Sequence, residues 1–327
     1  MPSARLLVQT LIFGVAVCAM SAPSSAQAPS QSWPQRTVRL ITPLGPGSGM
    51  DIAARTFAEK LSQRWGHPVV VENRQGGDGI PAVQSMLSDR DNHSLIYGFA
   101  GLVSINPIIH EKLPYDAARD IVPVASVVDA TIPLVVSETL KVGSTAEFVA
   151  LARAQPGQLN WAATTGLPLY IVAALQKSAG IDITQISYRD FGPAFQDFAT
   201  GRVHLLATGI TGLLPQVNAG RGKFLFVPNR ERSPLAPDVP TAVEAGFPDL
   251  TFDAVNGIYG WRDMPAALKD RIAADVRAIA ADPAVAERLK PTGAVMRPGT
   301  AAEFSAAIAQ QRAQVAAVAQ MLVAKPK

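Results

Sequence analysis

A glycine-rich loop from Pro43 to Met50 holds the residue types best suited to contact a small ligand. A β-branched run from Val38 to Pro43 leads into this loop, and an amphipathic helical pattern from Ile52 to Trp65 follows it. Glycines let the main chain approach a ligand closely, and the first N–H groups of a helix are unpaired donors at the positive end of its macrodipole. The loop therefore predicts an anion site, with Asp51 as a cap of the helix.

Nucleotide-binding loops share part of this pattern. Gly45, Gly47 and the later acid Glu72 fit a dinucleotide fingerprint, but Met50 stands where the third glycine should be. The P-loop pattern is also absent, because no Lys-Ser or Lys-Thr pair follows the glycines. We therefore expect no nucleotide and no other cofactor.

The remaining reactive residue types do not form a recognisable catalytic or metal-binding pattern. Four histidines, at His67, His93, His110 and His204, lie far apart and lack the spacing of metal ligands. A nucleophile elbow of the G-x-S-x-G type does not occur in the sequence. The net charge of +3 is modest and the basic residues are scattered, which argues against nucleic acid as a partner.

The N-terminal residues have the pattern of a secretory signal peptide. Arg5 provides the positive region, Leu6 to Met20 is apolar, and Ala26 to Ala28 fits an A-x-A cleavage site. We expect the chain to be exported and cleaved near Ala28. The only cysteine, Cys18, lies in this leader, so the mature chain would contain no thiol and no disulfide.

Strand and helix patterns alternate in two sets along the mature chain, which predicts two α/β units. The expected elements of the first set are strands at 38–43, 67–73 and 94–99 and helices at 52–65 and 82–87. Those of the second set are helices at 145–154, 169–179 and 193–200 and strands at 159–163, 183–188 and 203–208. Apolar stretches around 120–137 and 250–261 predict two crossings between the units, and an Ala-rich helical tail is expected to pack on the first unit.

Five segments of the chain resemble the Bug, or TctC-type, periplasmic receptors of tripartite tricarboxylate transporters. The segments are VRLITPLGPGSGMDIAAR at 38–55, VVVENRQGGDG at 69–79, NPIIHEKLPYD at 106–116, PDVPTAVEAGFP at 237–248 and DPAVAERL at 282–289. The resemblance covers nearly the whole mature chain. It implies a type II, Venus-flytrap binding protein in which each lobe is a wound, mostly parallel sheet with flanking helices. We expect 1–28 to be the signal peptide, 29–127 and 253–327 the first lobe, and 128–252 the second.

The resemblance also implies where the ligand is held. Receptors of this family hold a carboxylate largely through main-chain groups at two facing loops, here 43–50 in the first lobe and 163–170 in the second. Ala100 is expected to contribute to the site as well. The substrate-binding residues expected in these segments are Leu44, Gly45, Gly47, Ser48, Gly49, Met50, Ala100, Thr164, Thr165, Gly166 and Tyr170.

A third segment departs from the family pattern and affects the choice of ligand. Arg189 offers a forked pair of donors to a carboxylate, or else pairs with a neighbouring acid. Asp190 is expected to accept from a hydroxyl or amine of the ligand. Phe191, together with Phe99 and Tyr170, is interpreted as an apolar wall for an aromatic or aliphatic acid, although core packing is the alternative for each ring.

The resemblance implies a solute receptor that is not an enzyme. Its expected ligand is a small organic acid with one or two carboxylates, and its expected partner is the membrane permease of a tripartite transporter. We expect a monomer. Two alternatives stay open at this point: a sensor that presents the bound acid to a membrane signalling protein, and a secreted α/β enzyme.

Overall fold

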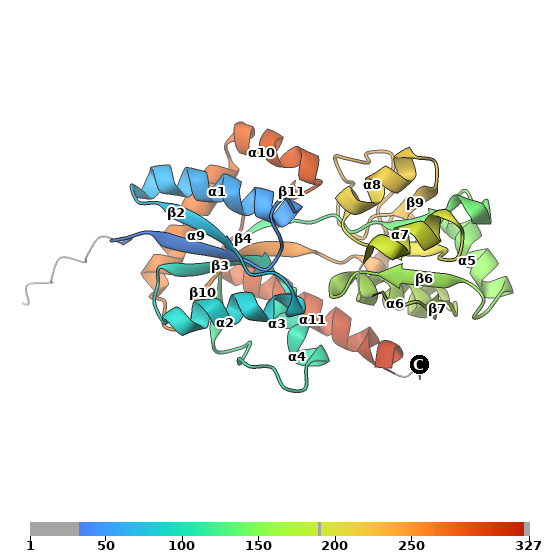
Figure 1. Cartoon of the computed structure of the whole chain (residues 1–327), viewed down its shortest axis with the longest axis horizontal. Helices are drawn as coiled ribbons and strands as arrows, with labels where there is room; N and C mark the ends of the chain where they lie inside the picture. The colour runs from blue at the N-terminus through green and yellow to red at the C-terminus, as the bar shows by residue number, and fades with distance from the viewer. Residues whose placement is uncertain (1–32, 189–190, 324–327) are drawn as a thin grey trace, which may run out of the picture.

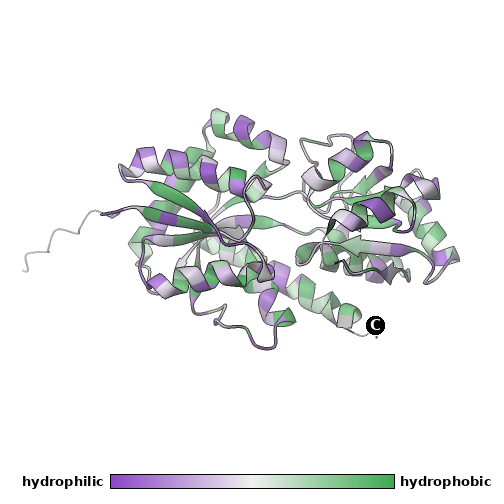
Figure 2. Ribbon diagram, viewed as in Figure 1, coloured by the Kyte–Doolittle hydropathy of each residue, from purple (hydrophilic) through white to green (hydrophobic). Residues whose placement is uncertain are grey.

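The computed structural model of the protein describes residues 33–188 and 191–323. The chain forms two α/β lobes that lie side by side, each built on its own sheet (Figure 1). Hydrophobic residues run along the strands of both sheets, while hydrophilic residues are frequent on the outer helices (Figure 2). This distribution follows from the sequence, because strands covered by helices on both faces must be apolar throughout.

The first lobe contains a six-stranded sheet in the order β11-β4-β10-β3-β1-β2. Strand β1 lies between β2 and β3 and is parallel to both, as the βαβαβ pattern predicts. The strands are β1 (Val38–Thr42), β2 (Val69–Asn73), β3 (Ser94–Phe99), β4 (Ile121–Asp129), β10 (Val255–Trp261) and β11 (Val295–Met296).

Helices cover both faces of the first sheet. One face packs against α1 (Gly49–Trp65), α9 (Ala266–Ala280) and α10 (Pro283–Leu289) through a core that includes Phe57 and Val276. The opposite face packs against α2 (Ile80–Asp89), α3 (Gly101–Ser104) and the start of α11 (Ala301–Val323). The short helix α4 (Asn106–Ile109) follows α3.

The second lobe contains a five-stranded sheet in the order β7-β6-β8-β5-β9. Its strands are β5 (Leu134–Ser137), β6 (Asn160–Ala163), β7 (Thr184–Gln185), β8 (Leu205–Ala207) and β9 (Gly222–Phe226). Its helices are α5 (Thr145–Ala154), α6 (Leu167–Ala179), α7 (Phe191–Ala199) and α8 (Ile210–Asn218). Helices α5 and α6 pack on one face of the sheet, and α7 and α8 pack on the other.

The two-lobed α/β fold is confirmed, and both sheets are mixed, with most strands of each running in one direction as expected. In the first sheet β10 is antiparallel to β3 and β4, and in the second β5 is antiparallel to β8 and β9. The reason lies in the two crossings. The chain leaves the first sheet along β4 and returns along the adjacent β10, so these neighbours run in opposite directions.

The first crossing lies between Asp129, the last residue of β4, and Leu134, the first of β5. The expected division after residue 127 therefore falls inside β4. The return crossing ends at Val255, where β10 begins. Two adjacent crossings of this kind form a hinge between lobes.

The C-terminal helix α11 joins the two lobes. Its first half packs on the first sheet through Phe304 and Ile308. Its second half carries Val315 and Val318, which are buried against α6 of the second lobe. The sequence predicted that the tail packs back on the first lobe, and this is wrong for the second half of α11, whose apolar stripe continues past the edge of that lobe.

Candidate functional site

The first half of the site is the loop that joins β1 to α1. Ser48 caps α1, because its Oγ accepts a hydrogen bond from the Asp51 amide at 3.2 Å. The N–H groups of Gly49 and Met50, at the start of the helix, have no hydrogen-bond partner among the described residues. A 17-residue helix therefore presents free donors at the positive end of its macrodipole.

Asp51 fixes the shape of this loop. Its buried carboxylate accepts from the Gly47 amide at 2.9 Å, from Arg55 Nε at 3.0 Å and from Asn73 Nδ2 at 2.8 Å. Burial acts to raise the pKa of Asp51, but the hydrogen bonds from Arg55, Asn73 and Gly47 outweigh it and lower the pKa below its ordinary value. Asn73 Nδ2 also donates to Leu44 O at 2.8 Å. The cap expected at Asp51 is instead Ser48, while Asp51 lies in the first turn and holds the residue before the cap.

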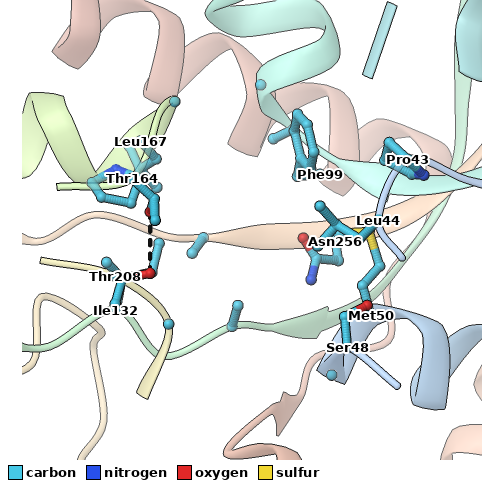
Figure 3. Close-up of a pocket in the computed structure, with 18 of the residues that line it drawn as sticks. Pro43, Leu44, Ser48, Met50, Phe99, Ile132, Thr164, Leu167, Thr208 and Asn256 are labelled. Carbon is cyan, nitrogen blue, oxygen red and sulfur yellow. Dashed lines mark hydrogen bonds between the residues drawn. The ribbon is translucent and has the colours of Figure 1, made fainter. Parts of the chain in front are cut away.

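The second half of the site is the loop from β6 to α6. Gly166 precedes α6 with φ 82° and ψ −143°, and Pro168 lies in the first turn of the helix. The amides of Gly166 and Leu167 have no hydrogen-bond partner among the described residues. Thr164 Oγ1 lies 3.2 Å from Thr208 Oγ1, which ties this loop to the end of β8 (Figure 3).

A third helix N-terminus reaches the same place. Helix α8 begins at Ile210, directly after Thr208 and Gly209, and all three residues line the cavity between the lobes. The Ile210 amide donates to Thr131 O at 3.0 Å, which joins this turn to the first crossing. The second lobe thus turns the starts of two helices toward the first lobe.

Between the two halves lies a cavity of about 720 Å³. Its walls are largely apolar, and Figure 3 shows Phe99, Met50, Leu167 and Ile132 around it. Of the described residues that line it, none is a lysine or an arginine. An anion in this cavity would therefore be held by neutral donors, namely main-chain N–H groups, hydroxyls and side-chain amides.

Eight of the expected site residues line this cavity. They are Leu44, Ser48, Gly49, Met50, Ala100, Thr164, Thr165 and Gly166. Gly45 and Gly47 shape the first loop without lining the cavity, and Gly47 adopts φ 81°. Ala100 serves as wall, since its amide already donates to Val255 O at 2.9 Å.

Two aromatic residues expected in the site lie elsewhere. Tyr170 is buried in a core cluster that also includes Ile105 of the first lobe, and it does not line the cavity. Phe191 starts α7 and packs edge-to-face on Phe195, with ring centroids 5.2 Å apart. The interpretation of both rings as cavity walls is wrong, whereas Phe99 does line the cavity. Arg189 and Asp190 lie outside the described residues.

The sequence analysis missed several residues that line the cavity. Gly76 to Gly79 form a second loop of the first lobe, Thr208 to Gly212 form the start of α8, and Asn256 lies in β10. The sequence did contain a signal for the start of α8. The strand that ends at Ala207 is followed by threonine and glycine, and the strand that ends at Ala163 is followed by the same residue types. Asn256 gave no such signal, because it lies inside a strand.

Within residues 33–188 and 191–323 no group of three or more histidine, aspartate or glutamate side chains is placed to hold a metal ion. His110 instead pairs with Asp78, with Nε2 3.0 Å from Oδ2. Glu72, the acid that fitted a dinucleotide fingerprint, is paired with Arg39 at 2.7 Å. Over the same described ranges, no helix is long and apolar enough to cross a membrane.

The fold and the site are those of a solute-binding protein. It has two α/β lobes joined by a double crossing, and its cavity is lined by helix N-termini from both lobes. A family model described as the tripartite tricarboxylate transporter family receptor matches residues 53–323, and the chain belongs to this family. The family is one of receptors, and the chain is accordingly not an enzyme.

Similar proteins agree with this assignment. The chain is 30% identical over 321 residues to a UPF0065 protein of Bordetella bronchiseptica, covering 98% of this chain and 95% of that protein. It is 30% identical over 250 residues to the protein BugT of Bordetella pertussis, covering 75% of each chain.

Two solved structures from Rhodopseudomonas palustris share the fold. Rpa4515 with adipate superposes with a TM-score of 0.76 at 27% identity, covering 88% of this chain and 97% of that one. MatC with bound malate superposes with a TM-score of 0.71 at 27% identity, covering 86% of this chain and 100% of that one.

Proposed function

We propose that this protein is a periplasmic receptor that binds a small organic carboxylate between its lobes and delivers it to a tripartite tricarboxylate permease. The family to which it belongs supports the receptor role and the choice of permease. The expected signal peptide at 1–28 supports export, with cleavage near Ala28.

One observation carries the proposal. Unpaired N–H groups from both lobes, at Gly49 and Met50 on one side and at Gly166 and Leu167 on the other, border one cavity. Helix N-termini favour anions, and their donors are held by the fold, so little ordering is needed when the ligand arrives. A carboxylate fits this set, because each of its oxygens accepts more than one hydrogen bond.

The walls indicate what the rest of the ligand is. The side chains of Phe99, Ile132 and Leu167 give the cavity apolar walls beside the two groups of donors (Figure 3). Such a lining suits an acid with a hydrocarbon body rather than a sugar or a peptide. The adipate and malate bound to the two Rhodopseudomonas palustris proteins are small organic acids.

Binding and closure follow from the hinge. The acid binds to the donors of one lobe, and rotation about the two crossings brings the donors of the other lobe onto it. Closure excludes water, which strengthens each charge-assisted hydrogen bond. The closed, loaded form would be the one that the permease recognises.

A thermal-shift screen followed by titration calorimetry tests the proposed function. The panel comprises adipate, malate, hexanoate and benzoate at millimolar concentration, with glucose as a neutral control. A ligand that binds only the folded state raises the melting temperature by mass action, so at least one acid should stabilise the protein and glucose should not. The absence of stabilisation by every organic acid tried would contradict the proposal.

The delivery step needs a separate measurement. Loaded and empty receptor are incubated with membranes that contain a tripartite tricarboxylate permease, and crosslinked products are compared. We expect crosslinking to the permease to increase when the acid is present. Crosslinking to a membrane kinase instead would support the sensor alternative.

A further inference from the structure

Asn256 is a buried amide side chain without a hydrogen-bond partner on the described protein. The residue is only 7% exposed, and no hydrogen bond is formed by its side chain among the described residues. The two other amides that line the cavity differ from it. Asn106 Nδ2 donates to Asp78 O and to Tyr115 Oη, both at 3.0 Å, and Gln311 Nε2 donates to Asp253 O at 2.9 Å.

The main chain holds Asn256 firmly in place. It lies in β10, where it is paired with Phe99 of β3 on one side and with Val128 of β4 on the other. The register of β10 against β4 shifts between Asn256 and Gly257. Irregularities of this kind change the direction of a side chain and are frequent beside binding sites.

The amide faces the first half of the site. In Figure 3 the side chain of Asn256 extends from β10 into the space between Phe99 and the start of α1, where Ser48 and Met50 are drawn. This is the helix end whose Gly49 and Met50 amides lack partners among the described residues. The amide group is open to the cavity, so a ligand carboxylate there can accept the Nδ2–H in place of water.

We infer that Asn256 is a specificity-determining residue that donates its Nδ2–H to the same ligand carboxylate as the Gly49 and Met50 amides. The inference rests on the proposed function, because it assumes that an organic acid occupies the cavity. A neutral side-chain donor beside a helix N-terminus completes an anion site in which no described lining residue is a lysine or an arginine.

The isosteric pair of asparagine and aspartate gives a sharp test. Asn256→Asp keeps the shape of the side chain but replaces the donor with a second carboxylate, which would repel the carboxylate of the ligand. Asn256→Ala removes the donor without adding charge. Asn218→Asp makes the same charge change at the far end of α8 and serves as the matched control.

Dissociation constants are measured by calorimetry for the acid, among adipate, malate, hexanoate and benzoate, that binds the wild-type protein. We expect Asn256→Ala to weaken binding about tenfold, the effect of losing one hydrogen bond to a charged group. Asn256→Asp should weaken it about 100-fold, because two like charges then meet in a buried site. The control should bind within about twofold of the wild type, as surface changes away from a site do.

Melting curves by circular dichroism show whether each variant is folded. If Asn256→Asp does not fold, Asn256→Ser, which keeps a donor, is compared with Asn256→Ala and should retain the tighter binding of the two. Equal binding by wild type, Ala and Asp variants would overturn the role of Asn256 while leaving the receptor function intact. Tighter binding by the Asp variant would show that Asn256 accepts from the ligand, which also overturns it. Failure of every acid to bind the wild type would overturn both proposals.

Discussion

The carboxylate of Asp51 accepts a hydrogen bond from the main-chain N–H of Gly47, with Oδ2 2.9 Å from the nitrogen. The same side chain is held by Arg55 and Asn73, so one buried carboxylate organises the turn before α1. Asp51 lies outside the cavity lining and acts on the site only through the loop. Its removal should therefore affect stability and binding together.

We predict that Asp51→Ala lowers the free energy of unfolding by about 3 kcal/mol, because several donors to a charged group lose their acceptor. It should also weaken binding of the acid, since the loop loses its order. Urea unfolding followed by circular dichroism measures the first effect, and calorimetry measures the second. An Asp51→Ala protein as stable as the wild type would show that the loop does not depend on this carboxylate.

Gly166, before α6, is the residue at which a substitution should disturb the second half of the site. Its backbone, at φ 82° and ψ −143°, lies close to the region that is essentially restricted to glycine. No atom lies within 4 Å of a Cβ added there, so Gly166→Ala causes strain without a clash. We expect a loss of about 1 to 3 kcal/mol in stability or a relaxed loop, and in either case at least about tenfold weaker binding.

Gly180, at the other end of α6, is the matched control. It ends the helix in the left-handed conformation, at φ 59° and ψ 45°, and also has open space at its Cβ position. Gly180→Ala should cost about 1 kcal/mol of stability and leave the dissociation constant unchanged. Equal losses of binding in the two variants would indicate that α6 acts through its stability alone.

The sequence was sufficient to predict the elements that repeat a local pattern. Strand β1, the glycine loop and α1 follow from a β-branched run, three glycines and an amphipathic period, and all are found as expected. The α6 loop was predicted in the same way. These features depend on residues close together in the chain, which is why one sequence reveals them.

Features that depend on distant parts of the chain were not predictable in this way. The antiparallel position of β10 between β3 and β4 is set by the path of the chain between lobes. Tyr170 could not be assigned to core or cavity, because a helix at a lobe boundary has apolar residues on both faces. Asn256 reaches the cavity only because β10 starts at the crossing between the lobes. It lies far from the glycine loop in the sequence, so no local pattern could have predicted that the two meet.

Asp129 provides a pH prediction at the hinge. It ends β4, is buried, and lies beside Arg297, which also contacts Asp253 at 3.2 Å; Asp253 in turn pairs with Arg230 at 3.1 Å. Burial, aided by the like charge of Asp253 and opposed by Arg297, raises the pKa of Asp129 from 3.8 to about 6. The folded state therefore binds a proton more tightly than the unfolded state.

The sign of the effect follows from that difference. The stabilisation by protonated Asp129 is fully present below pH 3.8 and is lost as the pH rises through about 6. It amounts to about 3 kcal/mol at most. An asparagine side chain cannot titrate, so Asp129→Asn should reduce the change in unfolding free energy between about pH 4 and about pH 7 by about 1 to 3 kcal/mol relative to the wild type. Identical pH profiles in urea unfolding would show that Asp129 titrates normally.

Val315 tests whether α11 holds the lobes together. Its side chain is fully buried in α11, and it belongs to the same core cluster as Ile171 of α6, so a residue of the tail supports the second lobe. Val315→Ala should lower the free energy of unfolding by about 2 kcal/mol, since removing buried methyl groups leaves a small cavity. Val243→Ala, at a residue 52% exposed, should change it by less than about 0.5 kcal/mol. If α11 joins the lobes, the Val315→Ala variant should still unfold in one transition, at a lower urea concentration than the wild type. Separate transitions for the two lobes would show that their stabilities are not coupled through this helix.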